Sequence, residues 1–250
     1  MSIKKGKISH ITITELLNLI NNRWTWILFL MYVLFTFTVY FSKSFRESRI
    51  ELIDGNIFIT LTNQYLPFFL IATILIVVSP LFAADKKIGM EELGDTCRNG
   101  KRYWKLSKII ASILYMLISV AVGFIVTIFM SSISKTPLNF EMTAFESANP
   151  DIAFNNAQFY LFSFTMILIG MLFIVLVILL ISSKTNDSLI PLASVGLFCG
   201  IEAVLFALHA PYYLWDLNIF RLLTPYSLLF DSSSLFSPAL RAIIIIISIY

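Results

Sequence analysis

Long apolar runs alternate with shorter polar connections along almost the whole chain. Complete runs cover 24–41, 66–84, 109–133, 158–181 and 189–210, and a further run begins near residue 239. A bilayer core of about 30 Å needs about 20 helical residues, so each complete run is long enough to cross it. The run over 239–250 spans only about 18 Å, so we expect a sixth span that is incomplete in this chain. The pattern predicts an all-α, polytopic membrane protein with one transmembrane domain over 1–250.

The composition agrees with this pattern. Hydrophobic residues make up 58% of the chain and charged residues only 13%, whereas a soluble domain carries about 25% charged residues. Too few polar side chains remain to coat a soluble globule of this length, so the composition excludes a soluble enzyme. The two cysteines, Cys97 and Cys199, provide neither a disulfide framework nor a metal-ligand spacing. We expect both to be reduced or simply packed.

The segment before the first apolar run has a helical period. Ile13, Leu16, Leu17 and Ile20 fall at positions i, i+3, i+4 and i+7, which lie on one face of a helix. The segment is too short and too polar to cross a bilayer. It therefore predicts an amphipathic helix over 11–22 that lies along the cytoplasmic interface. A disordered polar tail is the alternative.

The positions of Lys and Arg predict the orientation, because cytoplasmic loops carry the excess of these residues. Twelve of the 18 fall on one side: Lys4, Lys5, Lys7, Arg23, Lys86, Lys87, Arg98, Lys101, Arg102, Lys105, Lys108 and Lys184. This side should face the cytoplasm, which places the N-terminus and the 85–108 segment inside. Richness in Ile, Lys, Asn and Phe is typical of an AT-rich bacterial genome, so we expect a multi-pass protein of a bacterial cell membrane.

The connections on the outer side differ in character. Those over 42–65 and 134–157 are mixed and moderately acidic, which predicts ordinary loops. The last, over 211–238, contains a half-apolar run from 214 to 230. Because this run is too polar to span and too apolar for a solvated loop, it predicts a re-entrant or interfacial helix broken at Pro225.

The segment over 85–108 holds the densest charge in the chain. Acids lead and bases follow: Asp85, Lys86, Lys87, Glu91, Glu92, Asp95, Arg98, Lys101, Arg102, Lys105 and Lys108. A loop that only set topology would need the bases and not the acids, and 24 residues exceed what joins two antiparallel helices. Gly94 and the pair Asn99–Gly100 predict turns, with a short helix before them and a second short helix leading into the third span. Such a projection suits docking of a soluble protein. A solvated basic loop that touches anionic lipid is the alternative.

The order of elements resembles the ABC-2 type permeases, the membrane subunits of ATP-binding-cassette exporters. These proteins have a cytoplasmic amphipathic helix followed by six spans, with a coupling segment between the second and third. The matching positions here are Asp85, Lys86, Gly89, Glu92, Leu93, Arg102 and Lys108. The chain departs from the family pattern at Met90, where Thr is common, and it has no Pro in the turn.

The resemblance implies a permease that is not itself an enzyme. A separate cytoplasmic ATPase would bind ATP and Mg²⁺ and drive export through the coupling segment, in which Glu91, Asp95 and Arg98 are further charged contacts. A second permease chain, identical or homologous, would complete the pathway. A peptide, a lipid or a drug-like molecule is a possible substrate. The chain itself lacks a P-loop, because the run from Gly94 has five residues between its glycines and Arg102 stands where Ser or Thr should bind magnesium.

One carboxylate lies inside a predicted span and offers a different function. Glu202 is about thirteen residues from the cytoplasmic end of its span, and His209 follows seven residues later on nearly the same helical face. An ionisable group at that depth is a functional-site hypothesis by default. The pair could form the proton path of a secondary transporter or channel that needs no ATPase. A purely structural role for Glu202, and a scaffold or immunity protein that only binds a partner, are the other readings.

Overall fold

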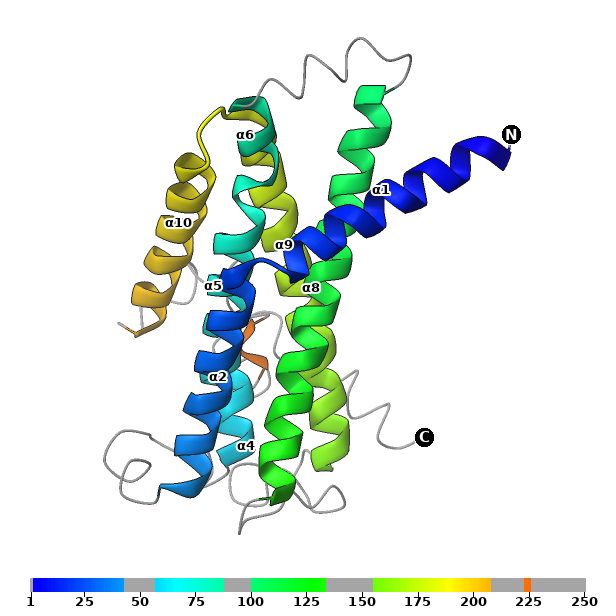
Figure 1. Cartoon of the computed structure of the whole chain (residues 1–250). Coiled ribbons are helices and arrows are strands. Elements are labelled where there is room, and N and C mark those ends of the chain that lie inside the picture. The colour runs from blue at the N-terminus through cyan, green and yellow to red at the C-terminus, as the bar shows by residue number, and fades with distance from the viewer. Residues whose placement is uncertain (1, 43–56, 88–99, 134–154, 208–222, 226–250) are drawn as a thin grey trace, which may run out of the picture. The chain divides into compact units, whose positions relative to one another are not determined.

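The computed structural model describes residues 2–42, 57–87, 100–133, 155–207 and 223–225; within these ranges the side chains of 2–8, 87, 100–102 and 202–207 are not described. The described part is built from helices (Figure 1). They are α1 (Ser2–Ile20), α2 (Arg23–Phe41), α4 (Ile57–Thr60), the π-helical turn η2 (Leu61–Tyr65), α5 (Leu66–Val78), α6 (Pro80–Lys87), α8 (Gly100–Ile133), α9 (Asn156–Lys184) and α10 (Leu189–Ala207).

Four helical stretches are long enough and apolar enough to cross a membrane. Among the described residues they are Arg23–Phe41, Ile57–Lys86, Tyr103–Ile133 and Asn156–Lys184, and they coincide with four of the five predicted complete spans. The fifth predicted span is also helical, but only its stretch Leu189–Ile201 counts as an apolar helix, and that stretch is shorter than the other four. The sixth run, over 239–250, lies outside the described residues. These four helices indicate a membrane protein.

The prediction of a connecting loop over 42–65 is wrong for the C-terminal part of that range. Ile57–Tyr65 is helical and largely buried, so the second candidate span begins well before residue 66. Its polar side chains are tolerated there because they bond to their own helix. Thr62 Oγ1 donates to the Phe58 carbonyl, and Asn63 Nδ2 donates to the Ile59 carbonyl at 2.9 Å. These local bonds make "TLTNQY" compatible with a span, although its composition resembles a loop.

The third span also starts earlier than predicted. α8 runs without a break from Gly100 to Ile133, so the predicted second short helix is the first part of the span itself. α6 covers the position of the first short helix as far as Lys87. The turn between them, over 88–99, lies outside the described residues.

α1 is longer than the predicted 11–22 segment. Its buried side chains are Thr12 and Leu19, whereas Ile13 and Leu17 are 56% and 50% exposed. Two residues of the predicted apolar face, Ile13 and Leu17, are therefore exposed, and the other two, Leu16 and Ile20, are half-buried; the place of α1 at the membrane surface stays a prediction. α1 ends before Asn22, whose Oδ1 accepts from the Trp24 N–H at 3.0 Å and caps the start of α2.

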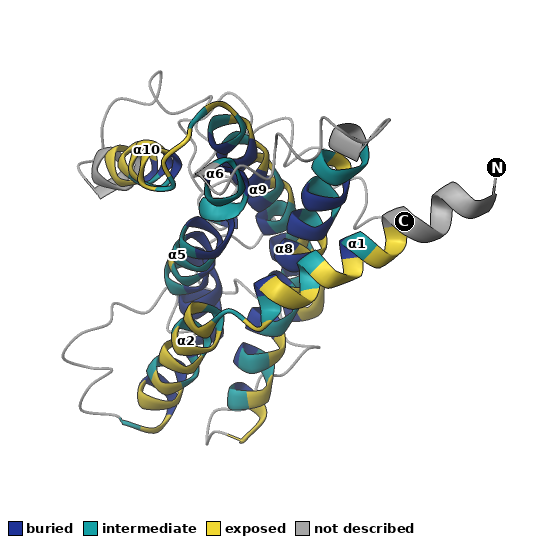
Figure 2. Cartoon of the chain, turned by 45° about the horizontal axis from the view of Figure 1, so that its top comes forward, coloured by how far each residue is buried: buried dark blue, intermediate teal, exposed yellow. Residues whose placement is uncertain are grey.

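The chain divides into two compact units. Unit 1 comprises Met1–Leu30, Leu70–Ser119 and Met171–Ile201, and unit 2 comprises Met31–Phe69, Val120–Gly170 and Glu202–Tyr250. Burial also differs between helices: in the most apolar 18-residue stretch of each, 56% of the residues are buried in Ile57–Lys86, compared with 22% in α2. Figure 2 shows the same contrast, with α5 mostly dark blue and teal and with yellow exposed residues along α2 and α10.

Neutral contacts join the helices in unit 2. Tyr32 and Thr127 share a hydroxyl–hydroxyl hydrogen bond of 2.6 Å between α2 and α8. The Phe124 and Tyr160 rings meet edge to face, with centroids 5.0 Å apart. The absence of a side chain at Gly123 makes room for Leu66, because a Cβ there would lie 2.6 Å from Leu66 Cδ1. α5 and α8 therefore approach closely at this glycine.

Candidate functional site

The second candidate span is broken near one end. α5 ends at Val78, Ser79 forms a turn, and α6 begins at Pro80. Proline has no N–H to donate to the carbonyl four residues earlier, but it suits the first position of a new helix, where that N–H would have no partner. α6 is therefore a separate segment with its own N-terminus.

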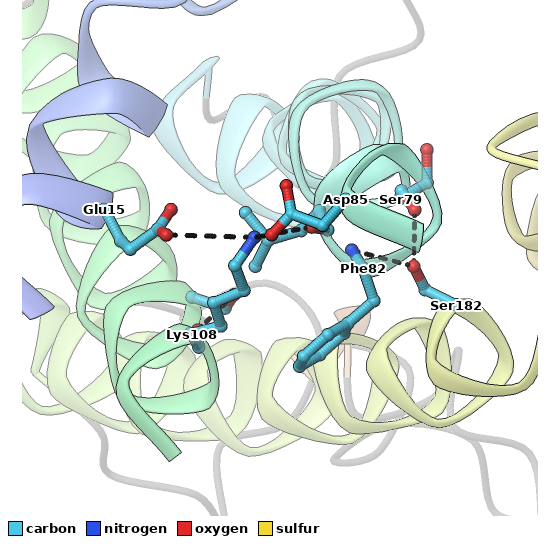
Figure 3. Close-up of polar contacts among 8 residues, drawn as sticks. Glu15, Ser79, Phe82, Asp85, Lys108 and Ser182 are labelled. Atoms are coloured by element: carbon cyan, nitrogen blue, oxygen red, sulfur yellow. Dashed lines mark hydrogen bonds and ion pairs between the residues drawn. The ribbon is translucent and has the colours of Figure 1, made fainter. Parts of the chain in front are cut away.

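A side chain from α9 satisfies the backbone at this break (Figure 3). Ser182 Oγ donates to the Ser79 carbonyl at 2.8 Å and accepts from the Phe82 N–H at 3.3 Å. The first N–H groups of a helix have no partner within it, so Ser182 acts as a cap supplied by another helix. Ser182 is 0% exposed and Ser79 is 1% exposed.

A buried ammonium lies on another side of α6. Lys108, from the first half of α8, donates from Nζ to the Leu81 carbonyl at 2.8 Å and forms an ion pair with Asp85. Glu15 of α1 is the second carboxylate, with Oε1 3.8 Å from Nζ. The Lys108 side chain is only 3% exposed, whereas Asp85 and Glu15 are 21% and 19% exposed. We call Lys108, Asp85 and Glu15 the lysine cluster; it joins α1, α6 and α8 at one point (Figure 3).

Two aromatic rings complete the surroundings of the ammonium. Lys108 Nζ lies 4.9 Å from the centroid of the Trp104 ring and 5.9 Å from that of Phe82. The two rings meet edge to face, with centroids 5.7 Å apart. Because ring faces attract cations, they stabilise the charge of Lys108 from the side that the carboxylates leave free.

Glu15 is the carboxylate in excess, since one ammonium faces two acids. Burial raises the pKa of Glu15 above its ordinary value of 4.5, the attraction of Lys108 opposes this shift, and repulsion from Asp85 adds to it. Burial is the largest of these causes. Glu15 therefore takes up a proton more readily than a solvated glutamate.

Two further side chains, Lys86 and Thr25, hold the elements around the cluster. Lys86 Nζ donates to the Ser183 carbonyl, which places a cation at the C-terminal turn of α9, where helix carbonyls lack partners. Thr25 Oγ1 donates to the Leu19 carbonyl at 2.9 Å and shares a hydrogen bond of 2.9 Å with Tyr115 Oη of α8. α6 and α9 thus cap each other, and the end of α1 is joined to α8 at a second point.

The structure brings together some of the sequence-predicted site residues. Asp85 and Lys108, at opposite ends of the charged segment, form an ion pair, and Lys86 contacts α9. The others are not placed: Gly89, Glu91, Glu92, Leu93, Asp95, Arg98 and His209 lie outside the described residues, and Arg102 and Glu202 are helical but their side chains are not described. Of the cysteines, Cys199 is buried, and Cys97 lies outside the described residues.

Sequence reasoning missed Glu15, Pro80 and Ser182 as parts of the site. A Ser–Pro pair inside an apolar run signals a broken span, so Pro80 could have been recognised. Glu15 falls between Thr12 and Leu19 at helical spacing, so it shares their buried face. Ser182 gives no such signal, because a serine in a membrane helix usually bonds to its own backbone.

The lysine cluster connects helices that lie far apart in the sequence. In the described part of the chain, no group of His, Cys, Asp and Glu could hold a metal ion. The lysine cluster instead joins three helices where the charged segment begins and ends. Comparison with protein-family models, with curated proteins and with solved structures finds no match for this chain, so the resemblance to the ABC-2 permeases stays a prediction from its sequence.

Proposed function

We propose that this chain is the permease subunit of an ATP-binding-cassette exporter, and that it forms the export pathway while a separate cytoplasmic ATPase supplies the work. The observation that carries the proposal is the lysine cluster. It fixes the two ends of the 85–108 segment to each other, through Asp85 and Lys108, and to α1 through Glu15.

This geometry supports coupling for a physical reason. Separating a buried ammonium from its carboxylate costs about 3–5 kcal/mol, so the ends of the charged segment do not part readily. A partner that displaces the segment moves α6 and α8 with it. Because Glu15 contacts the same ammonium, α1 is displaced too. A loop that only set topology would need no such anchoring.

The remaining parts of the proposal follow from the sequence. The protein spans a bacterial cell membrane with its N-terminus and the 85–108 segment in the cytoplasm, since Lys and Arg gather there. ATP and Mg²⁺ bind to the partner ATPase, and this chain is not an enzyme. A second permease chain completes the pathway. The substrate is a peptide, a lipid or a drug-like molecule.

The test first seeks a neighbouring gene with a Walker motif as the candidate ATPase, and then uses its product and the full chain together in proteoliposomes. Three probes are loaded: a fluorescent phospholipid, a hydrophobic peptide and a lipophilic dye. We expect ATP to drive export of at least one probe, and replacement of the catalytic carboxylate of the ATPase to stop it. Export that survives this replacement contradicts the proposal.

The same assay distinguishes the proton-driven alternative. Glu202→Gln keeps the shape and hydrogen-bonding capacity of the side chain but cannot titrate. ATP-driven export should continue in this variant and should resist proton uncouplers. Loss of transport in Glu202→Gln, together with loss in the parent when uncouplers are added at constant ATP, identifies a secondary transporter that uses Glu202 and His209.

A further inference from the structure

We infer that the Ser79–Pro80 break is a hinge at the start of α6 and that Ser182 of α9 is the positioning residue that holds it closed. The inference concerns the Ser79 carbonyl and the Phe82 N–H, to which Ser182 bonds; Lys108 of the coupling segment bonds to the Leu81 carbonyl between them. Its role in transport rests on the proposed function, but the hinge itself does not.

The break leaves the Phe82 N–H without a backbone partner in α6, while the Ser79 carbonyl, at the N-cap of α6, has room for a second donor. Pro80 has no N–H, and Phe82 is the third residue of α6, so its N–H has no carbonyl within that helix. An unsatisfied polar group in a buried, apolar place costs about 1–3 kcal/mol. One hydroxyl, that of Ser182, both donates to the Ser79 carbonyl and accepts from the Phe82 N–H.

The hydroxyl of the neighbouring Ser183 bonds elsewhere, so the capping of the break by a hydroxyl of α9 is particular to Ser182. Ser183 Oγ donates to the Leu180 carbonyl at 2.8 Å, within its own helix, which is the ordinary behaviour of a helical serine. Ser182 instead makes both of its bonds to α6 and the residue before it. Two adjacent serines therefore provide a test residue and a matched control.

The contacts of α6 differ between its two ends. Its C-terminal half carries Asp85 and Lys86, whose charges bind Lys108 and the Ser183 carbonyl. Its N-terminal turn receives one charge-assisted bond, from Lys108 Nζ to the Leu81 carbonyl, and the neutral hydroxyl of Ser182 bonds to Ser79 and Phe82 across the break. Neutral hydrogen bonds contribute less than charge-assisted ones, so the Ser182 bonds across the break release before the contacts of Lys108, which holds both Leu81 and Asp85. α6 can then turn at Ser79–Pro80 while α5 keeps its own backbone hydrogen bonds.

Amide hydrogen exchange on the full chain in lipid nanodiscs, read by mass spectrometry over residues 81–86, tests the hinge. Ser182→Ala should speed exchange about tenfold, because it removes one buried partner from two backbone groups. Ser183→Ala should leave exchange unchanged. Pro80→Ala restores the missing N–H, so the double variant Pro80→Ala/Ser182→Ala should exchange no faster than the parent.

Two outcomes overturn the inference: equal exchange in Ser182→Ala and Ser183→Ala, or fast exchange that Pro80→Ala does not rescue. If Ser182→Ala does not fold, Pro80→Ala alone decides between a hinge and a rigid kink. If the break is a hinge, the continuous helix of Pro80→Ala should exchange more slowly than the parent over residues 81–86. If the break is a rigid kink, Pro80→Ala and the parent should exchange at the same rate. In the proteoliposome assay, Pro80→Ala should lower ATP-driven export while the ATPase still co-purifies. Unchanged export in Pro80→Ala overturns the role of the hinge in transport. If the ATPase does not bind even to the parent chain, the proposed function is contradicted, but the hydrogen-exchange result for the hinge still holds.

Discussion

The α6 region of unit 1 and the core of unit 2 hold their helices together in different ways. In unit 1 a buried ammonium binds two carboxylates and a backbone carbonyl. In unit 2 the helices meet through aromatic rings and through the neutral Tyr32–Thr127 hydroxyl pair. Removal of one partner from a buried ion pair costs about 3–5 kcal/mol, whereas hydrogen bonds between membrane helices average about 0.6 kcal/mol.

This difference indicates where the packing of the helices depends most on particular residues. The ring and hydroxyl contacts of unit 2 can be exchanged for others of similar shape at little cost. The contacts of Lys108 cannot, because an unpaired charge would remain. The contacts that depend on particular residues therefore lie beside the charged segment, where a partner would act.

The largest expected effect is on the Asp85–Lys108 pair. Asp85→Asn deprives an ammonium that is 3% exposed of its closest carboxylate, so we expect a loss of about 3 kcal/mol in the free energy of unfolding. Asp187→Asn is the matched control: Asp187 is exposed, it caps the Leu189 N–H, and asparagine caps equally well. Thermal unfolding of both variants in detergent measures the effect, and equal melting temperatures contradict the account.

A smaller effect is expected from steric overlap in unit 2. In Gly123→Ala the new Cβ lies 2.6 Å from Leu66 Cδ1, and Leu66 is only 1% exposed. Overpacking costs about 1–3 kcal/mol, and the higher helix propensity of alanine returns about 1 kcal/mol. We expect a net loss of about 1 kcal/mol. Gly200→Ala meets no atom within 4 Å and should be neutral or stabilising; the reverse order of the two variants would show that α5 and α8 do not approach at Gly123.

The neutral hydroxyl pair should matter less again. Thr127→Val keeps the shape of the side chain and removes the hydroxyl that bonds to Tyr32. The expected loss is about 0.6 kcal/mol, measured by the same unfolding assay. A loss as large as that of Asp85→Asn would remove the contrast between the two regions.

The smallest effect, and the one that depends on pH, concerns Glu15. Its pKa is raised in the folded protein, so the folded state binds this proton more readily than the unfolded state does. Its favourable contribution is complete below the ordinary pKa of 4.5 and is lost as the pH rises through the folded pKa. At pH 7, Glu15→Gln should be at least as stable as the parent, and the parent should gain relative to it on acidification. If the parent is instead more stable than Glu15→Gln at pH 7 and loses this advantage in acid, folding lowers the pKa of Glu15 and the account is contradicted.

The sequence predicts the helical class and most of the spans, because a run of apolar residues has few alternatives in a bilayer. It fails where polar residues find partners at short range: Thr62 and Asn63 bond to their own helix, so the last part of a predicted loop belongs to a helix that is long and apolar enough to span a membrane. It also predicts Asp85 and Lys108 as site residues but not their pairing. That pairing, and the use of Ser182 by α6, depend on which helices pack together, and no local pattern encodes this.

The central claim is that the 85–108 segment docks an ATPase, and co-purification after charge reversal tests it most directly. The variant reverses Glu91, Glu92, Asp95 and Arg98, which leaves Asp85 and Lys108 intact to anchor the segment. A control reverses four charges in the predicted outer connection: Lys43, Arg46, Glu47 and Arg49. The account predicts that the tagged chain loses the co-expressed ATPase in the first variant and keeps it in the control, with both inserted in the membrane. ATPase recovered in equal amounts with both variants would contradict it.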